Sequence, residues 1–503
     1  MPISGGRAAF CPPYYTTKIN GKVILNASIT LIGEDFHVDL FRKKEINAVI
    51  ERDKEFRQCL TAFDLTFLGI GAIIGAGIFV LSGVVAATTA GPAIILSYIL
   101  AGLACAFSAL SYAELAAMIG GCGSAYGYAY AGFGEIIAWI VGWDLLLEYI
   151  IAVSAVAVGW GSYFNDILLS LKINFPIALL HGPSSGGFLN IIPVFIVTIL
   201  SALLILGIKS SVRFNNLMVI IKLSIIGLFI VIAVGEFETK NWVPFLPFGW
   251  LGVVKGASLI FFSYVGVDAI STASEEAINP QRDIPIGLIS ALIICTILYI
   301  VVSGLLTGIV PYTQLDVASP ISNSLLKLGY KMAASVIGIG AIAGITTVML
   351  VLFFGLSRVF YAMARDGLLP QYFAVTNQKT KTPTRIIVIC GVLIAITASL
   401  IPLEGLAELV NIGTLFAFII VCAGVIILRY RRPDLIRPFK TPFMPYIPIM
   451  GIICCLYLIV NLPWITLLRF VIWMFIGGII YFKFSRHNSV LSNEQKINLQ
   501  IHR

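Results

Sequence analysis

Charged residues are scarce in this sequence. They make up 12% of its 503 residues, whereas a soluble protein keeps roughly 25% to cover its surface. Hydrophobic residues account for 59%, and the mean hydropathy is +0.97. No polar stretch is long enough to form a soluble domain, so we expect lipid to be the solvent for most of the surface. The formal net charge of +8 then reflects membrane orientation rather than a nucleic-acid partner.

Histidines and the usual catalytic motifs are missing from the apolar parts of the chain. All four histidines, His37, His181, His487 and His502, lie outside the apolar runs, so we expect no metal site within the membrane. The sequence has neither a phosphate-binding loop nor a His-Glu-x-x-His pair. Six of the nine cysteines fall inside apolar runs, which excludes a disulfide framework. We therefore expect a protein that is not an enzyme and that holds no metal or organic cofactor.

Polar segments flank one long apolar region. Residues 1–62 are expected to form a cytoplasmic amino-terminal tail, residues 63–483 a transmembrane domain, and residues 484–503 a cytoplasmic carboxyl-terminal tail. Residues 1–35 differ in character from the rest of the chain, and one explanation is a misassigned start, with translation beginning near Val38.

Apolar runs of about the length that crosses a bilayer fill the central region. They predict an all-α membrane protein of about 12 transmembrane helices. The third run is too long for one straight span, so we expect a tilted helix that is bent around Gly142 or Gly159. The runs lie near residues 64–89, 93–118, 126–164, 188–207, 213–235, 252–276, 286–310, 334–362, 384–402, 411–430, 444–462 and 464–483.

The distribution of basic residues predicts the orientation. If the amino terminus is cytoplasmic, 26 of the 33 lysines and arginines lie in cytoplasmic segments and only four lie in external loops. Because cytoplasmic loops are enriched in Lys and Arg, we expect both termini to be cytoplasmic. The expected location is the cell membrane, which the chain crosses several times.

The first and sixth spans carry features that weaken a helix. The first contains Gly69, Gly71, Gly75 and Gly77 within nine residues, and each glycine costs about 1 kcal/mol relative to alanine. Small residues at such spacing also suit close helix packing, which is the structural alternative. The sixth reads Phe-Ser-Tyr-Val-Gly-Val-Asp at 262–268, with a glycine and an acid inside the bilayer. We interpret both spans as broken helices.

These two spans open two five-helix groups, residues 63–235 and 251–431, and residues 444–483 supply two further helices. Paired interruptions at corresponding places in two halves indicate a transporter site. An unwound segment frees amides that suit a carboxylate and carbonyls that suit an ammonium. A zwitterionic α-amino acid carries both charges on one carbon, so it is the expected small-molecule substrate.

Five segments together form a specific combination of motifs, at 71–79, 142–149, 262–268, 275–285 and 358–370. With them, the chain resembles the amino acid–polyamine–organocation superfamily, in the branch of cationic amino acid transporters and their bacterial relatives. The resemblance implies the leucine-transporter fold, with inverted repeats of spans 1–5 and 6–10, broken helices 1 and 6, and two extra carboxyl-terminal helices. It says nothing about residues 1–35.

The resemblance also implies which residues bind the substrate. Amides of the first span are expected to hold the carboxylate, and carbonyls of both broken spans the ammonium; the alternative is that the aromatic residues there only pack. Phe262 corresponds to the aromatic that closes over the substrate from the outside. The predicted set is Gly75, Ala76 and Gly77 for the carboxylate, and Ile73, Phe262, Ser263 and Val265 for the ammonium.

Lys222 is a charge at an unexpected depth. It follows Arg213 by nine residues in the fifth span, about 13 Å along a helix, where a lysine costs at least ~2.5 kcal/mol on insertion scales. Burial opposes the charged form, so this group is a candidate to gain and lose a coupling proton; a boundary lysine or a structural ion pair is the alternative. The resemblance agrees, because in proton-coupled relatives an ammonium takes the place of a sodium ion. Glu148 and Asp268 are the buried acids expected to modulate it.

We therefore expect a secondary transporter that imports small neutral or broad-range L-amino acids by alternating access and proton symport, with sodium less favoured. An amino acid exchanger, a cationic amino acid permease and a non-transporting sensor are the alternatives. The apolar sequence of the eighth span, residues 345–354, favours neutral over cationic substrates. The expected partners are the amino acid and the lipid bilayer.

Overall fold

The computed structural model describes residues 42, 58–119, 124–170, 172–173, 175–180, 182–183, 186–317, 319–377 and 379–492. Residues Leu40–Arg503 form one compact unit. The expectations for residues 1–35, and those for most of the amino-terminal tail, lie outside the described residues. Helices are the only regular elements in the described part, apart from one parallel β-bridge between Leu60 and Ala277.

Long apolar helices make up the described unit. Among the described residues, eight segments are long and apolar enough to cross a membrane, and the first of them, Ala62–Ile119, contains two of the expected spans. Three shorter apolar helices, α7 (Ile191–Leu206), α14 (Thr384–Leu400) and α16 (Tyr446–Val460), match three further expected spans. Within the described residues, each of the twelve expected spans thus has a helical segment. The main helices are α2 (Ala62–Ile73), α4 (Ile94–Ile119), α5 (Ala125–Gly132), α6 (Glu135–Ser170), α7 (Ile191–Leu206), α8 (Ile208–Gly235), α9 (Gly249–Ile260), α10 (Ala269–Thr272), α11 (Pro280–Ile309), α12 (Pro320–Lys327), α13 (Lys331–Arg365), α14 (Thr384–Leu400), α15 (Leu403–Arg431), α16 (Tyr446–Val460), α17 (Trp464–Ile480) and α18 (Arg486–Asn488).

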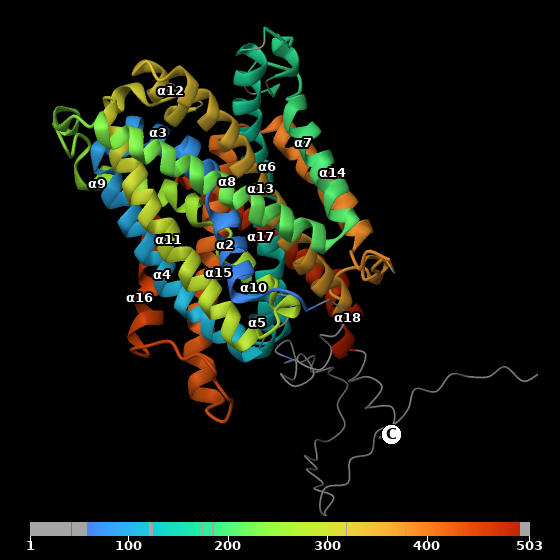
Figure 1. The fold of residues 1–503 in the computed structure, drawn as a ribbon. Helices are drawn as coiled ribbons and strands as arrows, with labels where there is room; N and C mark the ends of the chain where they lie inside the picture. Colours follow the sequence, from blue (N-terminus) through green and yellow to red (C-terminus); the bar gives the residue numbers. More distant parts are fainter. Residues whose placement is uncertain are drawn as a thin grey trace, which may run out of the picture. The chain divides into compact units, whose positions relative to one another are not determined.

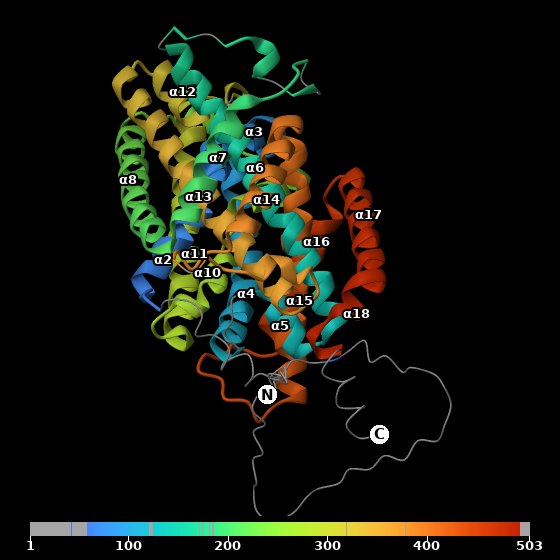
Figure 2. The ribbon, with the colours of Figure 1, turned by 90° about the vertical axis from the view of Figure 1, so that its right-hand side faces the viewer.

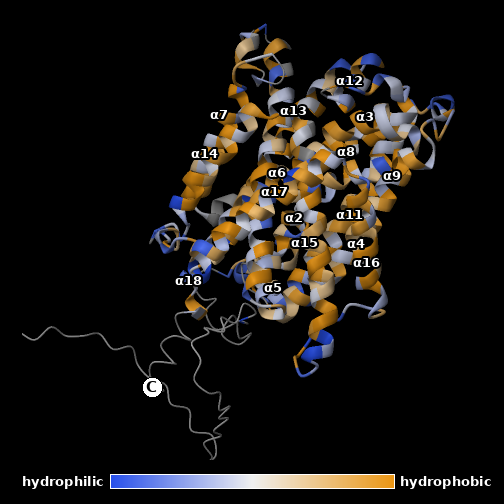
Figure 3. Cartoon of the chain, turned by 180° about the vertical axis from the view of Figure 1, so that it is seen from behind, coloured by the Kyte–Doolittle hydropathy of each residue, from blue (hydrophilic) through white to orange (hydrophobic). Residues whose placement is uncertain are grey.

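The long helices run side by side between two ends, which we name the α12 end and the α18 end (Figures 1 and 2). Helix α6 packs against both α13 and α15, and α11 packs against both α2 and α4. Apolar residues cover the helices, and polar residues gather toward the two ends (Figure 3). This distribution is typical of a protein whose helices lie in lipid.

The third apolar run differs from its prediction. It contains two helices, α5 and α6, separated at Phe133 and Gly134, and Gly134 has a φ of 107°. The expectation of a single helix over this run is therefore wrong, and α6 continues through both Gly142 and Gly159. Gly142 allows close packing, because a Cβ there would lie 2.7 Å from the sulfur of Met363.

The first span is interrupted. Helix α2 ends at Ile73, Ile74 has extended backbone angles, and a π-helical turn, η1 (Gly77–Leu81), begins the second half. Helix α3 (Ser82–Val85) and a second π-helical turn, η2 (Ala86–Ala90), continue that half. The glycine-rich sequence thus produces a break rather than a continuous packed helix.

The sixth span is interrupted as well. Helix α9 passes into a 3₁₀ turn, η7 (Phe261–Tyr264), and α10 begins only at Ala269. Gly266, between them, has a φ of 101°, a conformation that L residues with a side chain rarely adopt. The two predicted breaks in spans 1 and 6 are both present in the structure.

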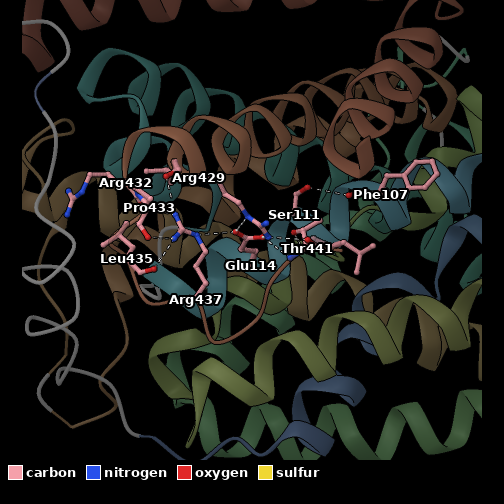
Figure 4. Close-up of polar contacts among 11 residues, drawn as sticks. Phe107, Ser111, Glu114, Arg429, Arg432, Pro433, Leu435, Arg437 and Thr441 are labelled. Atoms are coloured by element: carbon pink, nitrogen blue, oxygen red, sulfur yellow. Dashed lines mark hydrogen bonds and ion pairs between the residues drawn. The ribbon is translucent and has the colours of Figure 1, made fainter. Parts of the chain in front are cut away.

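A buried carboxylate joins α4, α15 and the segment after α15 at the α18 end (Figure 4). The two oxygens of Glu114 accept hydrogen bonds from Arg429 at 2.9 and 2.7 Å, and Oε2 also accepts from the backbone amide of Thr441 at 2.7 Å. The Nε atom of Arg437 lies 3.4 Å from Oε1. Glu114 is 1% exposed, so its charge is compensated almost entirely by these groups.

We predict that Glu114→Gln destabilises the protein, because two guanidinium groups lose a buried counter-charge. Removing one partner of a buried ion pair costs on the order of 3 kcal/mol. The measurement is thermal unfolding of purified protein in detergent, where the variant should unfold several degrees below the wild type. Asp434→Asn is the matched control, because Asp434 pairs with Arg432 at the exposed surface. Equal melting temperatures for the two variants would contradict the prediction.

Candidate functional site

A small cavity lies where the two interruptions meet. The first and sixth spans supply most of its wall, and α6 and α13 supply the rest. Every side chain that lines it is apolar or absent. The lining residues are Ala72, Ile73, Gly75, Ala76, Gly77, Val156, Phe262, Val265, Val348 and Leu352.

The structure brings six of the seven predicted substrate-binding residues together around this cavity. The seventh, Ser263, packs directly against the first span. A Cβ on Gly77 would lie 2.2 Å from the Oγ and 2.6 Å from the Cα of Ser263, so the two broken spans touch where the first carries no side chain. The six that line the cavity are Ile73, Gly75, Ala76, Gly77, Phe262 and Val265.

Backbone groups give this apolar cavity its polarity. Gly75, Ala76 and Gly77 stand at the amino terminus of the second half of span 1, where the first amides of a helix have no acceptor within it. These amides and the helix dipole favour an anion. Ile73 stands at the opposite terminus, where α2 ends and its last carbonyls are free of helix partners. The broken first span therefore carries donors and acceptors a few residues apart beside the cavity.

Two buried tyrosines that the sequence analysis did not select donate to carbonyls of the two broken spans. The hydroxyl of Tyr299 in α11 donates to the carbonyls of Ile73 and Ser263, with oxygen–oxygen distances of 2.7 and 2.8 Å. The hydroxyl of Tyr98 in α4 donates to the carbonyl of Gly77 at 3.3 Å. A tyrosine inside an apolar run needs a partner for its hydroxyl, and this signal was available in the sequence.

Lys222 lies in the middle of α8 and is fully buried. Its Nζ atom donates to the carbonyls of Ile70, Gly71 and Ile74 at 2.8, 3.1 and 3.0 Å, and to Oγ1 of Thr347 at 3.0 Å. Three of these acceptors belong to the carboxyl-terminal end of α2, where the helix dipole favours a cation. The ammonium therefore caps the first half of the broken span.

No carboxylate of the described residues makes an ion pair with Lys222. Glu148 instead accepts a hydrogen bond from Thr414 at 2.6 Å, and Asp268 accepts one from the hydroxyl of Tyr149. Glu148 and Asp268 are near enough to interact electrostatically, and Asp144 belongs to the same group. The acids of spans 3 and 6 therefore lie near each other, whereas Lys222 binds backbone carbonyls.

Buried contacts join three spans toward the α18 end. The amides of Cys59 and Leu60, ahead of span 1, donate to the carbonyl of Glu276, which comes after span 6, at 2.8 and 2.9 Å. Arg358 in α13 forms an ion pair with Glu276 at 3.0 Å, and both side chains are at most 3% exposed. These contacts tie the ends of spans 1, 6 and 8 together.

The α12 end has a large open cavity above the broken part of span 1. Val80, Leu81 and Val84 form one wall, and the segment between α14 and α15 forms another. Polar side chains such as Asn165 and Asp316 also line it. This cavity shares no lining residue with the small cavity between the two broken spans.

The described residues contain no group of three or more His, Cys, Asp or Glu side chains that could hold a metal ion. What the site offers is backbone dipoles, one buried ammonium and an apolar wall. Two broken spans around a shared cavity indicate a transporter.

The chain belongs to the amino acid permease family, whose sequence profile matches residues 60–484. It is 47% identical to the methylthioribose transporter of Bacillus subtilis (strain 168) over 457 residues, which cover 90% of this chain and 99% of that protein. It is 48% identical to the branched-chain amino acid permease BcaP of the same organism over 461 residues, with the same coverage. It is 38% identical to the vacuolar cationic amino acid transporter 4 of Arabidopsis thaliana, with 78% of this chain and 68% of that protein covered. The predicted family and all-α fold are confirmed.

We predict that Gly77→Ala abolishes substrate binding, because the added methyl group would force spans 1 and 6 apart at Ser263. The measurement is the rise in melting temperature that saturating leucine produces, since a ligand that binds only the folded state stabilises it. Gly227→Ala is the matched control, because a Cβ on Gly227 meets no atom within 4 Å. The rise should occur in wild type and Gly227→Ala only, and a full rise in Gly77→Ala would refute the assignment of the site.

Proposed function

We propose that this protein imports neutral aliphatic L-amino acids, with branched side chains preferred, by proton symport. The observation that carries the proposal is the cavity itself, in which helix-terminal amides and freed carbonyls face a wall of apolar side chains. Such a site suits a molecule with a carboxylate, an ammonium and an aliphatic side chain. The similarity to a branched-chain amino acid permease supports the same substrate class.

The two charges of the substrate would bind at the two ends of the interruption. The amides of Gly75, Ala76 and Gly77 would hold the carboxylate, and the carbonyls of Ile73, Phe262, Ser263 and Val265 would surround the ammonium. Val156, Val348 and Leu352 would then contact the side chain, because they supply the cavity wall from α6 and α13. Phe262 would cover the substrate from the α12 end.

A cationic substrate is less well suited to this site. No acidic side chain lines the cavity, and Glu148 and Asp268 are engaged with Thr414 and Tyr149. A positively charged side chain would therefore enter an apolar space without a counter-charge, which is costly.

A ribose derivative is the second candidate, because a methylthioribose transporter is nearly as similar to this chain as the branched-chain permease. A methylthio group is apolar and would suit the wall formed by Val348 and Leu352. The sugar carries no carboxylate or ammonium, however, so the donor and acceptor ends of the broken helix would have no charged partners. The geometry favours the amino acid.

Lys222 is the proposed proton-coupling group, with Glu148 and Asp268 as acids that modulate it. Its ammonium occupies the space among three carbonyls that a sodium ion would need, which favours protons as the coupling ion. Loss of a proton would remove a donor from the end of α2 and weaken the contact between α8 and the first span. Protonation would thereby bias the position of the half-helix that carries the substrate site.

We further propose that the α18 end is cytoplasmic and that both termini lie on that side. Basic residues support this orientation, since 26 of 33 would then be cytoplasmic. The contacts of Glu276 would then lie on the cytoplasmic side and hold the site closed there. Two repeats, residues 63–235 and 251–431, would move relative to each other to open the site to one side and then to the other.

We predict that Lys222→Ala abolishes uptake that is driven by a pH gradient. The change removes the only proposed proton carrier of α8 and leaves the end of α2 without its cap. The measurement is accumulation of labelled leucine in liposomes at several external pH values. Lys255→Ala is the control, because Lys255 is an exposed lysine of α9. Full uptake with unchanged pH dependence in Lys222→Ala would exclude the coupling role.

The proposal as a whole is tested with purified protein in liposomes. Labelled leucine, alanine, arginine, glutamate and methylthioribose are offered under an inward pH gradient and then under a sodium gradient. We expect leucine to accumulate with the pH gradient and an uncoupler to abolish the accumulation. Uptake that requires preloaded amino acid would make the protein an exchanger. Accumulation of methylthioribose alone would show that the ribose derivative is the substrate.

A further inference from the structure

Tyr299 links the two interrupted spans through a single hydroxyl. Its side chain extends from α11 and is fully buried. The hydroxyl lies 2.7 Å from the carbonyl oxygen of Ile73, where α2 ends, and 2.8 Å from that of Ser263, in η7. One side chain of a continuous helix thus contacts the broken backbone of both spans.

The hydroxyl cannot satisfy both carbonyls fully. A phenol has one proton to donate, and among the backbone hydrogen bonds outside helices in the described part of the chain, none goes to either oxygen. The two carbonyls therefore share one hydroxyl proton. A buried carbonyl without a donor is costly, and an α-ammonium brings three donors to this place.

We propose that Tyr299 is a positioning residue that holds spans 1 and 6 together in the empty carrier and gives up its two carbonyls to the ammonium of an arriving amino acid. This inference rests on the proposed amino acid transport and adds a role for a residue outside the cavity lining. Once the substrate has left, the hydroxyl resumes its bonds, so the freed carbonyls are never bare in the membrane interior.

The role of Tyr299 separates two modes of transport. Net uptake requires the empty carrier to return to the outside, whereas exchange of internal for external substrate proceeds only through the loaded carrier. A residue that stabilises the empty carrier is therefore required for net uptake and dispensable for exchange. A residue that only supports the fold, or only contacts substrate, affects both modes alike.

Tyr264 provides a matched control within the same cluster. Its ring centroid lies 5.4 Å from that of Tyr299, and it is equally buried. Its hydroxyl donates at 3.0 Å to the carbonyl of Tyr98, which lies inside the continuous helix α4. Tyr264→Phe removes a tyrosine hydroxyl of the same kind but leaves the broken backbone with its donors.

The experiment compares wild type, Tyr299→Phe and Tyr264→Phe in liposomes, with labelled leucine as the probe. Net uptake is measured under an inward pH gradient, and exchange is measured against unlabelled leucine inside. We expect Tyr299→Phe to lower the maximal rate of net uptake about tenfold, on the scale of one hydrogen bond lost from a buried group. Exchange should change less than about twofold, and Tyr264→Phe should change neither rate by more than that.

An equal loss of both rates in Tyr299→Phe, or no loss in either, overturns the inference while leaving leucine transport by the wild type intact. Wild-type transport of methylthioribose without leucine also overturns it, because that substrate has no ammonium to replace the hydroxyl. If the wild type transports neither leucine nor methylthioribose, the proposed function fails. The melting temperatures of the two variants without substrate then test the inference separately. Tyr299→Phe must then melt below Tyr264→Phe, and equal melting temperatures overturn it.

Discussion

Backbone groups within a bilayer must find partners inside the protein, because lipid offers none. Spans 1 and 6 break at this depth, and each break exposes carbonyls and amides that a continuous helix would have paired. The surrounding helices supply the missing partners. Lys222 of α8 caps the end of α2, and Tyr299 of α11 bridges the carbonyls of Ile73 and Ser263. Lys222 and Tyr299 thus supply hydrogen bonds to backbone carbonyls that the two interruptions expose.

The same constraint explains how the proposed site could recognise a substrate with so few polar side chains. Its charges come from helix termini, which are fixed in place by the fold and need no flexible side chain. The close approach of the two broken spans, at Gly77 and Ser263, keeps the donors and acceptors at a fixed separation. In the proposed binding mode, recognition of the α-carbon charges would be common to all amino acids, and the apolar wall would set the preference for the side chain.

Local features of the sequence predicted a large part of this structure. Hydrophobic runs indicated the spans, since their length is set by the bilayer, and glycines and a buried acid indicated the two breaks. Six of the seven residues chosen for the substrate site line one cavity, although their binding role is still a prediction. The third run was misinterpreted because Phe133 and Gly134 interrupt it without a change in hydropathy, so two helices read as one.

The sequence by itself determined that this chain lies in a membrane, which segments span it, and which two spans are interrupted. These properties depend on residues that are neighbours along the chain. The tertiary structure alone decided that Lys222 meets carbonyls rather than Glu148 or Asp268, and that Tyr299 spans both breaks. Such pairings join residues more than 30 positions apart, and they form because each buried polar group takes the partner that helix packing brings within reach.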